Sequence, residues 1–146
     1  MARRIDVEIG ARAWEAAHKA HTNGDLAVYR SRAVELATML QQSGLTQTLS
    51  YLASRNDANQ RKVAFDLANE LRLHLSDAPD PNDGLGACVA FLLNTDEATR
   101  SMASVRAALF ADWLKRAVET LKHDQEQSAP NDQSQPAEVG APGSLR

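Results

Sequence analysis

Apolar residues along the first 122 positions recur at alternating spacings of three and four, which is the pattern of amphipathic helices. The strict alternation of apolar and polar residues that is typical of half-buried strands is absent. A turn-rich loop, SDAPDPNDG at 76–84, interrupts the pattern. The spacing and the capping residues predict six helices, over residues 4–22, 26–42, 45–55, 58–75, 85–94 and 95–122. Six helices joined by short loops predict an all-α fold, a compact bundle.

Each predicted helix has an apolar stripe that we expect to face the core. The fifth helix is apolar on most sides and is predicted to be central, and the apolar arc of the last helix covers nearly half of its circumference. On the first helix, Glu8, Arg12, Glu15 and Lys19 lie opposite the stripe and predict a solvated face of i,i+4 ion pairs. The predicted core includes Ile5, Ile9, Ala13, Ala16, Ala20, Leu26, Tyr29, Ala33, Leu36, Leu40, Leu45, Leu49, Leu52, Ala64, Leu67, Ala68, Leu71, Leu75, Met102, Leu109, Phe110, Trp113, Leu114, Ala117, Val118 and Leu121.

Composition changes sharply after the last predicted helix. Residues 124–146 contain three of the five Pro, no aromatic residue and few aliphatic residues. Such a segment cannot bury enough apolar surface to offset the entropy of ordering, so it predicts a disordered C-terminal tail. The predicted organisation is a helical domain of residues 1–123 followed by a tail of residues 124–146.

The remaining composition indicates one domain in a reducing compartment. The chain has 146 residues, 43% of them hydrophobic, and its one cysteine, Cys88, lies in an apolar run. There is no run of 18 apolar residues, and the N-terminus has no apolar segment of the kind found in secretory signals. We therefore expect a cytoplasmic protein with no membrane contact.

Charge excludes a domain that binds polyanions over its whole surface. The net charge is −3, and residues 1–123 contain 15 acidic and 15 basic residues, which sum to zero. A local basic face remains compatible with this balance. Twelve of the 16 bases are Arg, a residue suited both to phosphate contacts and to buried ion pairs.

The best candidate for such a face is the fourth predicted helix, where Arg61, Phe65 and Arg72 point away from the apolar stripe. An aromatic ring between guanidinium groups suits base stacking and phosphate contacts, although an arginine-lined rim over a partly buried Phe has the same pattern. With the neighbouring bases and those of the last helix, the candidate nucleic-acid contacts are Arg55, Arg61, Lys62, Arg72, Lys115 and Lys122.

Other positions are candidates for protein contacts. Val28 and Met39 lie far from the apolar seam of the second helix, and Leu73 lies off the stripe of the fourth. They are either scattered surface residues or contacts for a partner. Arg106 falls within the apolar arc of the last helix, where it would snorkel, pair internally, stack on Trp113 or face a partner protein.

Catalytic signatures are missing from the sequence. It has no glycine-rich phosphate loop, no G-x-S-x-G and no H-E-x-x-H. Glu15, His18 and His21 share a flank of the first helix, but a di-metal bundle needs two Glu-x-x-His motifs and only Glu15–His18 matches. We therefore predict no metal and no cofactor, and we expect His74 to pair with Glu70 one turn earlier.

Several segments together resemble one known family. They are YRSRAVELATMLQQSGLTQTLSYLASR at 29–55, the apolar fifth helix, and VRAALFADWLKRAVETL at 105–121. With the first helix, they resemble the small α-helical subunit of the type III-B (Cmr) CRISPR effector complex. The resemblance is carried by Tyr29, Gly44-Leu45, Thr48-Leu49, Tyr51 and Trp113-Leu114-Lys115-Arg116.

The resemblance implies a non-catalytic structural subunit in antiviral defence. Several copies of such a subunit stack in a row beside the backbone subunits and line the channel for the guide and target RNA. The implied partners are the other subunits of the complex, copies of this chain, and guide and target RNA. Two other hypotheses stay open: a helical protein–protein adaptor without nucleic-acid contact, and a metal-dependent enzyme that uses Glu15, His18 and His21.

Overall fold

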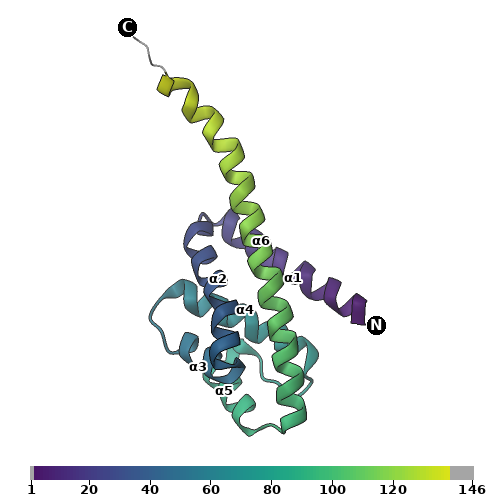
Figure 1. Ribbon diagram of the computed structural model, residues 1–146. Helices are drawn as coiled ribbons and strands as arrows, with labels where there is room; N and C mark the ends of the chain where they lie inside the picture. The colour runs from purple at the N-terminus through teal and green to yellow at the C-terminus, as the bar shows by residue number, and fades with distance from the viewer. Residues whose placement is uncertain (1, 139–146) are drawn as a thin grey trace.

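The computed structural model describes the backbone of residues 2–138 and the side chains of residues 5–127. This part of the chain forms six α-helices and no strand, which confirms the all-α prediction (Figure 1). A single 3₁₀ turn, η1 (Pro81–Asp83), lies in the predicted loop. The helices are α1 (Ala2–Thr22), α2 (Leu26–Ser43), α3 (Leu45–Ala53), α4 (Ala58–His74), α5 (Leu85–Asn94) and α6 (Glu97–Glu138).

The long helix α6 organises the bundle, because the most extensive contacts between any two described helices are those of α6 with α1 and with α2. Figure 1 shows α1 crossing α6, while α3, α4 and α5 gather around the half of α6 that begins at Glu97. The crossing is close at Gly10, where an added Cβ would lie 2.8 Å from Cε2 of Trp113. The indole N–H of Trp113 donates a hydrogen bond to Oδ1 of Asp6 at 2.8 Å, so the ring is held across α1 at two points.

Most of the predicted core residues are buried. The predicted stripes of α3 and α4 are buried in full, and four of the five predicted α2 residues are buried, with Leu40 packed at the edge. On α1 the predicted Ala16 lies at the edge of the core, and Ala17 takes the buried position. Ile9, Ala13 and Ala20 are buried as predicted, so the predicted stripe of α1 differs from the observed one mainly at this position.

Two predictions about the core are wrong. The fifth helix is not central: it contacts α3, α4 and η1 at the edge of the bundle, and Leu93 is 64% exposed. Met102 is 48% exposed, and Ala103 takes the inward position on α6. In both cases an apolar helix surface exceeds what the neighbouring helices can cover, and composition alone cannot tell which part is left to solvent.

Capping explains where several helices begin and end. The carboxylate of Asp57 accepts hydrogen bonds from the backbone amides of Asn59 and Gln60 and so caps the start of α4. These amides, chiefly that of Gln60, lower the pKa of Asp57 from its usual 3.8. Gly44 ends α2 with φ of +82°, a conformation that favours glycine. Asp25 occupies the N-cap position of α2 but makes no side-chain capping bond there.

The sequence predicts that the last helix ends near Lys122, whereas α6 continues to Glu138. An i,i+4 ion pair between Lys122 and Glu126, at 2.6 Å, supports the helix beyond the last packed apolar residue, Leu121. Figure 1 shows this end of α6 projecting away from the other helices. The division into a domain of residues 1–123 and a tail of residues 124–146 stays a prediction, and residues 139–146 lie outside the described residues.

Candidate nucleic-acid interface

Three of the six predicted nucleic-acid contacts already have a carboxylate partner within the chain. A cation that is held by a carboxylate has less net charge to offer a phosphate, because the two negative groups compete for it. The three pairs are Lys62–Asp66 at 3.9 Å, Arg72–Asp80 at 3.6 Å and Lys122–Glu126 at 2.6 Å.

The other three predicted contacts, Arg55, Arg61 and Lys115, form no ion pair with any acidic side chain among residues 5–127. All three are exposed. Their charges are therefore the ones most available to an anion. Two of them, Arg55 and Arg61, lie together where α3 is followed by α4.

Short contacts orient the two arginines at this junction. The guanidinium carbon of Arg55 lies 5.2 Å from the ring centroid of Tyr51, one turn earlier, and its Nε donates to the side-chain oxygen of Gln60 at 3.3 Å. The guanidinium of Arg61 donates from Nη1 to the carbonyl of Ala53 at the end of α3. These contacts hold both charged groups over the α3–α4 junction with N–H groups left to donate.

Tyr51 also belongs to the surface formed by Arg55 and Arg61, although it is not among the six predicted nucleic-acid contacts, which are all basic. It is 44% exposed, which is unusual for a large aromatic side chain on a helix that is otherwise packed. Its position four residues before Arg55 was a usable signal, since residues at i and i+4 face each other on a helix. An exposed ring beside a guanidinium group is an arrangement suited to contacts with bases as well as phosphates.

Beside the junction is an open hollow of about 430 Å³. The structure places Arg61 and Phe65 together there, as predicted, and adds Lys62, but not Arg72, which is near the other end of α4. The hollow is completed by the η1 turn and the first residue of α5. The additional lining residues are Pro81, Asn82, Gly84 and Leu85.

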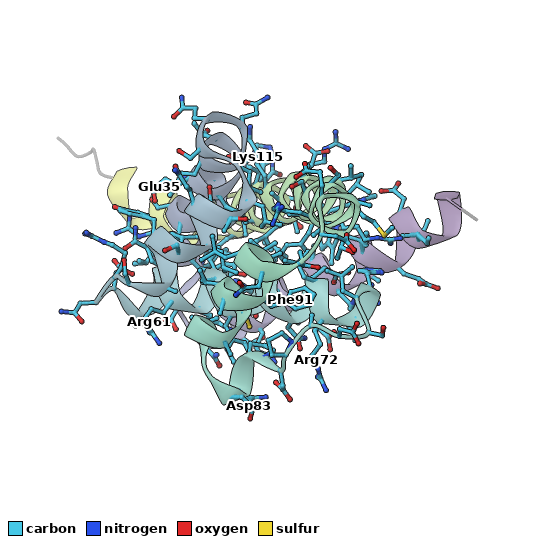
Figure 2. The ribbon with its side chains drawn as sticks, turned by 90° about the horizontal axis from the view of Figure 1, so that it is seen from below. Glu35, Arg61, Arg72, Asp83, Phe91 and Lys115 are labelled. Carbon is cyan, nitrogen blue, oxygen red and sulfur yellow. The ribbon has the colours of Figure 1, made fainter. Side chains whose placement is uncertain are left out.

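Lys115 belongs to a different face of the molecule. It lines a groove between α2 and α6 with Ala37, Gln41 and Ala108. Figure 2 shows Lys115 on the side of the bundle opposite Arg61 and Arg72. The six predicted contacts therefore do not form one surface, and the α3–α4 junction is where charge and aromatic side chains coincide.

Lys62 has a more restricted environment than its neighbours. Its Nζ lies 5.9 Å from the ring centroid of Tyr29, whose hydroxyl donates to Oδ2 of Asp66 at 2.8 Å. Burial raises the pKa of Asp66 above its usual value, and burial also raises the pKa of Tyr29. Lys62 therefore has a part in packing the α2–α4 contact, besides lining the hollow.

Several other arginines connect helices through ion pairs, which is the alternative to phosphate contacts that the sequence indicates for its abundance of arginine. Arg12 on α1 donates through Nε and Nη2 to both oxygens of the buried Glu70, at 2.7 and 2.8 Å. The sequence predicts that Arg12 lies on a solvated face of i,i+4 ion pairs, but it is partly buried against Glu70, and the hydrogen bond to Glu70 raises the arginine pKa. Arg30 makes the same two-bond contact with Glu119 on α6, at 3.0 and 3.1 Å.

Arg106 extends the cluster around Glu70. His74 lies 2.6 Å from Glu70 through Nε2, as predicted, and Arg106 lies 3.0 Å from the other ring nitrogen, Nδ1. An arginine can only donate, so Nδ1 is the acceptor in the contact with Arg106. Nε2 lies between Oε2 of Glu70, at 2.6 Å, and Nη2 of Arg12, at 3.4 Å. Arg106 thus has an internal partner, one of the alternatives that the sequence allowed, and its predicted contact with a partner protein stays a prediction.

The predicted apolar contact residues differ in exposure. Val28 is 48% exposed and Leu73 is 52% exposed, whereas Met39 is partly buried against the core. Val28 and Leu73 are on different helices, α2 and α4. Met39 therefore contributes to the fold whether or not it also meets a partner.

No metal-binding arrangement is found in the part of the chain that the structure describes, where no three His, Cys, Asp or Glu side chains are placed to hold an ion. Glu15, His18 and His21 do not form such a set, although the two imidazole rings are 6.2 Å apart. Cys88 is buried, and burial raises the pKa of its thiol. No described helix is long and apolar enough to cross a bilayer.

Comparison with known proteins identifies relatives. The family model described as CRISPR-associated protein (Cas_Cmr5) matches residues 6–121. The X-ray crystal structure of a CRISPR-associated Cmr5 family protein from Thermus thermophilus is similar, with a TM-score of 0.65 and 21% identity over 80% of this chain and 96% of that chain. At this level of identity the likeness concerns the fold. No curated protein matches the chain.

Proposed function

This chain belongs to the CRISPR-associated Cmr5 family, which confirms the resemblance drawn from its sequence, and on that premise we propose its role. It is a non-catalytic small structural subunit of a cytoplasmic type III-B RNA-guided effector complex in antiviral defence. It stacks with copies of itself beside the backbone subunits and helps to hold guide and target RNA. It transforms no substrate itself.

The observation that supports the RNA contact is the pair of arginines at the α3–α4 junction. Arg55 and Arg61 are exposed, and contacts with Tyr51, Gln60 and the carbonyl of Ala53 orient them. Neither guanidinium group has a carboxylate partner in the described part of the chain. Guanidinium groups in such a setting contact phosphate oxygens of any sequence. This suits a particle in which guide pairing supplies the sequence specificity.

The six predicted residues contribute unequally in this proposal. Arg55 and Arg61 are the main phosphate contacts, with Lys62 beside them in the hollow. Lys115 serves a second contact on the α2–α6 face, toward a neighbouring subunit or another part of the RNA path. Arg72 and Lys122 contribute less, because Asp80 and Glu126 partly neutralise them, and Lys62 contributes less than Arg61 for the same reason, through Asp66.

The test is the salt dependence of RNA binding by the assembled particle. Arg61→Glu, Lys62→Glu and Lys115→Glu are combined in one variant, and the affinity for target RNA is measured over a series of salt concentrations. Each phosphate contact that is lost lowers the log–log slope by roughly 0.7–0.9. An unchanged slope and affinity in a particle that still contains the variant would remove these residues from the RNA role.

A helical adaptor without nucleic-acid contact is the second candidate. The exposed apolar side chains of Val28 and Leu73 favour it, because apolar residues of this size on a helix exterior are suited to a protein partner. Co-purification of the chain with its partners after complete nuclease digestion, and with no bound RNA beforehand, would support the adaptor. Release of the partners by nuclease would support the RNA role.

A further inference from the structure

The hollow beside the α3–α4 junction differs from a simple basic patch, because part of its wall is apolar. Phe65, Pro81 and Leu85 supply rings and aliphatic groups from α4, η1 and α5. Arg61, Lys62 and Asn82 supply polar groups around the same space. Small-ligand sites combine apolar and polar groups around a concave surface, and the volume of this open hollow, about 430 Å³, lies within their usual range of roughly 300–1,000 Å³.

The charge around the hollow favours an anionic ligand on one side only. None of its lining residues is acidic, and Arg61 has no carboxylate partner among residues 5–127. Asp83 is exposed next to the opposite rim, formed by Asn82 and Gly84. Figure 2 shows Arg61 and Asp83 at separate edges of the molecule. A phosphate is therefore favoured at the Arg61 edge and disfavoured at the η1 edge.

From this arrangement we propose that the hollow binds one unpaired nucleotide of a single-stranded RNA. The base inserts against Phe65, with Pro81 and Leu85 on its other side, and its phosphate lies at Arg61 and Lys62. Asn82 has donor and acceptor groups for the edge of the base. The inference rests on the proposed RNA contact and adds to it, because phosphate contacts alone do not distinguish a single strand from a duplex.

The physical reason for this preference is access to the ring. In a duplex the faces of the bases are stacked on each other and are not available to a protein side chain. An unpaired base exposes both faces, and stacking on an aromatic side chain is worth about 1–3 kcal/mol per base. A wall made by Phe65 is therefore of use only to an unpaired or extruded base.

The test compares two variants of the full-length chain. Phe65→Leu removes the aromatic face and keeps an apolar side chain. Phe91→Leu makes the same change at another half-buried Phe, on α5, which lines a separate small cavity with Cys88 and Leu92. Circular dichroism establishes that both variants are folded. Affinities are then measured for a single-stranded RNA oligonucleotide and for an RNA duplex of the same length.

We expect Phe65→Leu to weaken single-strand binding by at least about fivefold, the lower limit for a lost stack, and to leave duplex binding unchanged. Phe91→Leu changes neither affinity. A 2-aminopurine base in the single strand is quenched on binding to the wild type and less so with Phe65→Leu. Equal effects on both RNAs, or none on either, would overturn the inference.

The same measurements separate the inference from the proposal that it rests on. Arg61→Gln should weaken binding of both RNAs. If it does so while Phe65→Leu has no effect, the phosphate contact stands and the nucleotide site is excluded. If the wild-type chain binds neither RNA, the RNA contact and the nucleotide site are both rejected for this surface.

Discussion

The crossing of α1 over α6 depends on the absence of a side chain at Gly10, and Gly10→Ala tests that dependence. An alanine Cβ would lie 2.8 and 2.9 Å from two carbons of the Trp113 indole and 3.2 Å from a third. Carbon atoms prefer separations of about 3.5–4.0 Å, so the ring would have to move by roughly 0.7 Å. The hydrogen bond from the indole to Asp6, at 2.8 Å, opposes that movement.

Two effects of opposite sign set the magnitude. Replacing Gly by Ala in a helix interior stabilises by about 1 kcal/mol. Overpacking of a closely packed contact costs about 1–3 kcal/mol, and loss of the indole hydrogen bond costs about 0.5–1.5 kcal/mol more. These effects leave a net loss of about 0.5–3.5 kcal/mol in the free energy of unfolding. At the middle of that range, about 2 kcal/mol, Tm should fall by roughly 4–8 °C.

Urea unfolding followed by circular dichroism measures the change. Gly86→Ala on α5 is the matched control, because an added Cβ there meets nothing within 4 Å, and this variant should be as stable as the wild type or more so. In a Trp113→Phe background the cost of Gly10→Ala should fall by about 1 kcal/mol. Equal stabilities of Gly10→Ala and Gly86→Ala would refute the close crossing.

Three further predictions concern buried or capping groups. Glu70→Gln should lower the free energy of unfolding by about 2–3 kcal/mol, because it weakens the ion pair between the buried Glu70 and the partly exposed Arg12. Glu35→Gln, which weakens an exposed ion pair, should cost less than about 0.5 kcal/mol. Equal costs of the two substitutions in denaturant unfolding would contradict this. Burial raises the pKa of Cys88, so a thiol reagent at pH 8 should react at least about tenfold more slowly with the native chain than in denaturant, and similar rates would show the thiol to be accessible. The pKa of Asp57 is lowered by the backbone amides that it caps, so its contribution to stability is present above its usual value of 3.8 and is lost as the pH falls through the lower folded-state value. The stability difference between wild type and Asp57→Ala should shrink over that range, and a difference that is constant with pH would exclude the cap.

The helices themselves could be predicted from local signals. Asp57 and Gly44 mark element ends through their own hydrogen bonds and backbone preferences, which depend on few neighbours. The surplus apolar surface of α5 and the exposure of Met102 could not be predicted, because they depend on which helices lie alongside. The same is true of Gly10, whose neighbour Trp113 is distant in sequence.

The candidate interface was only partly predictable for the same reason. Arg61 and Phe65 are four residues apart on one helix, so their proximity followed from spacing alone, and the i,i+4 pair of Lys122 with Glu126 was equally local. The pairing of Arg12 with Glu70 joins residues 58 positions apart, and no local pattern contains it. Which cations remain free for a ligand is decided by such distant partners.

The most direct test of the proposed role compares free and paired cations in RNA binding. The double variant Arg55→Gln, Arg61→Gln removes the two arginines that have no carboxylate partner among residues 5–127, and Arg72→Gln, Lys122→Gln removes two cations that have one. Affinity for single-stranded RNA is measured against salt concentration for both and for the wild type. We predict a log–log slope that is lower by up to about 1.4 in the first variant and nearly unchanged in the second. Equal slopes in all three proteins, or a larger change in the second variant, would contradict the proposed role.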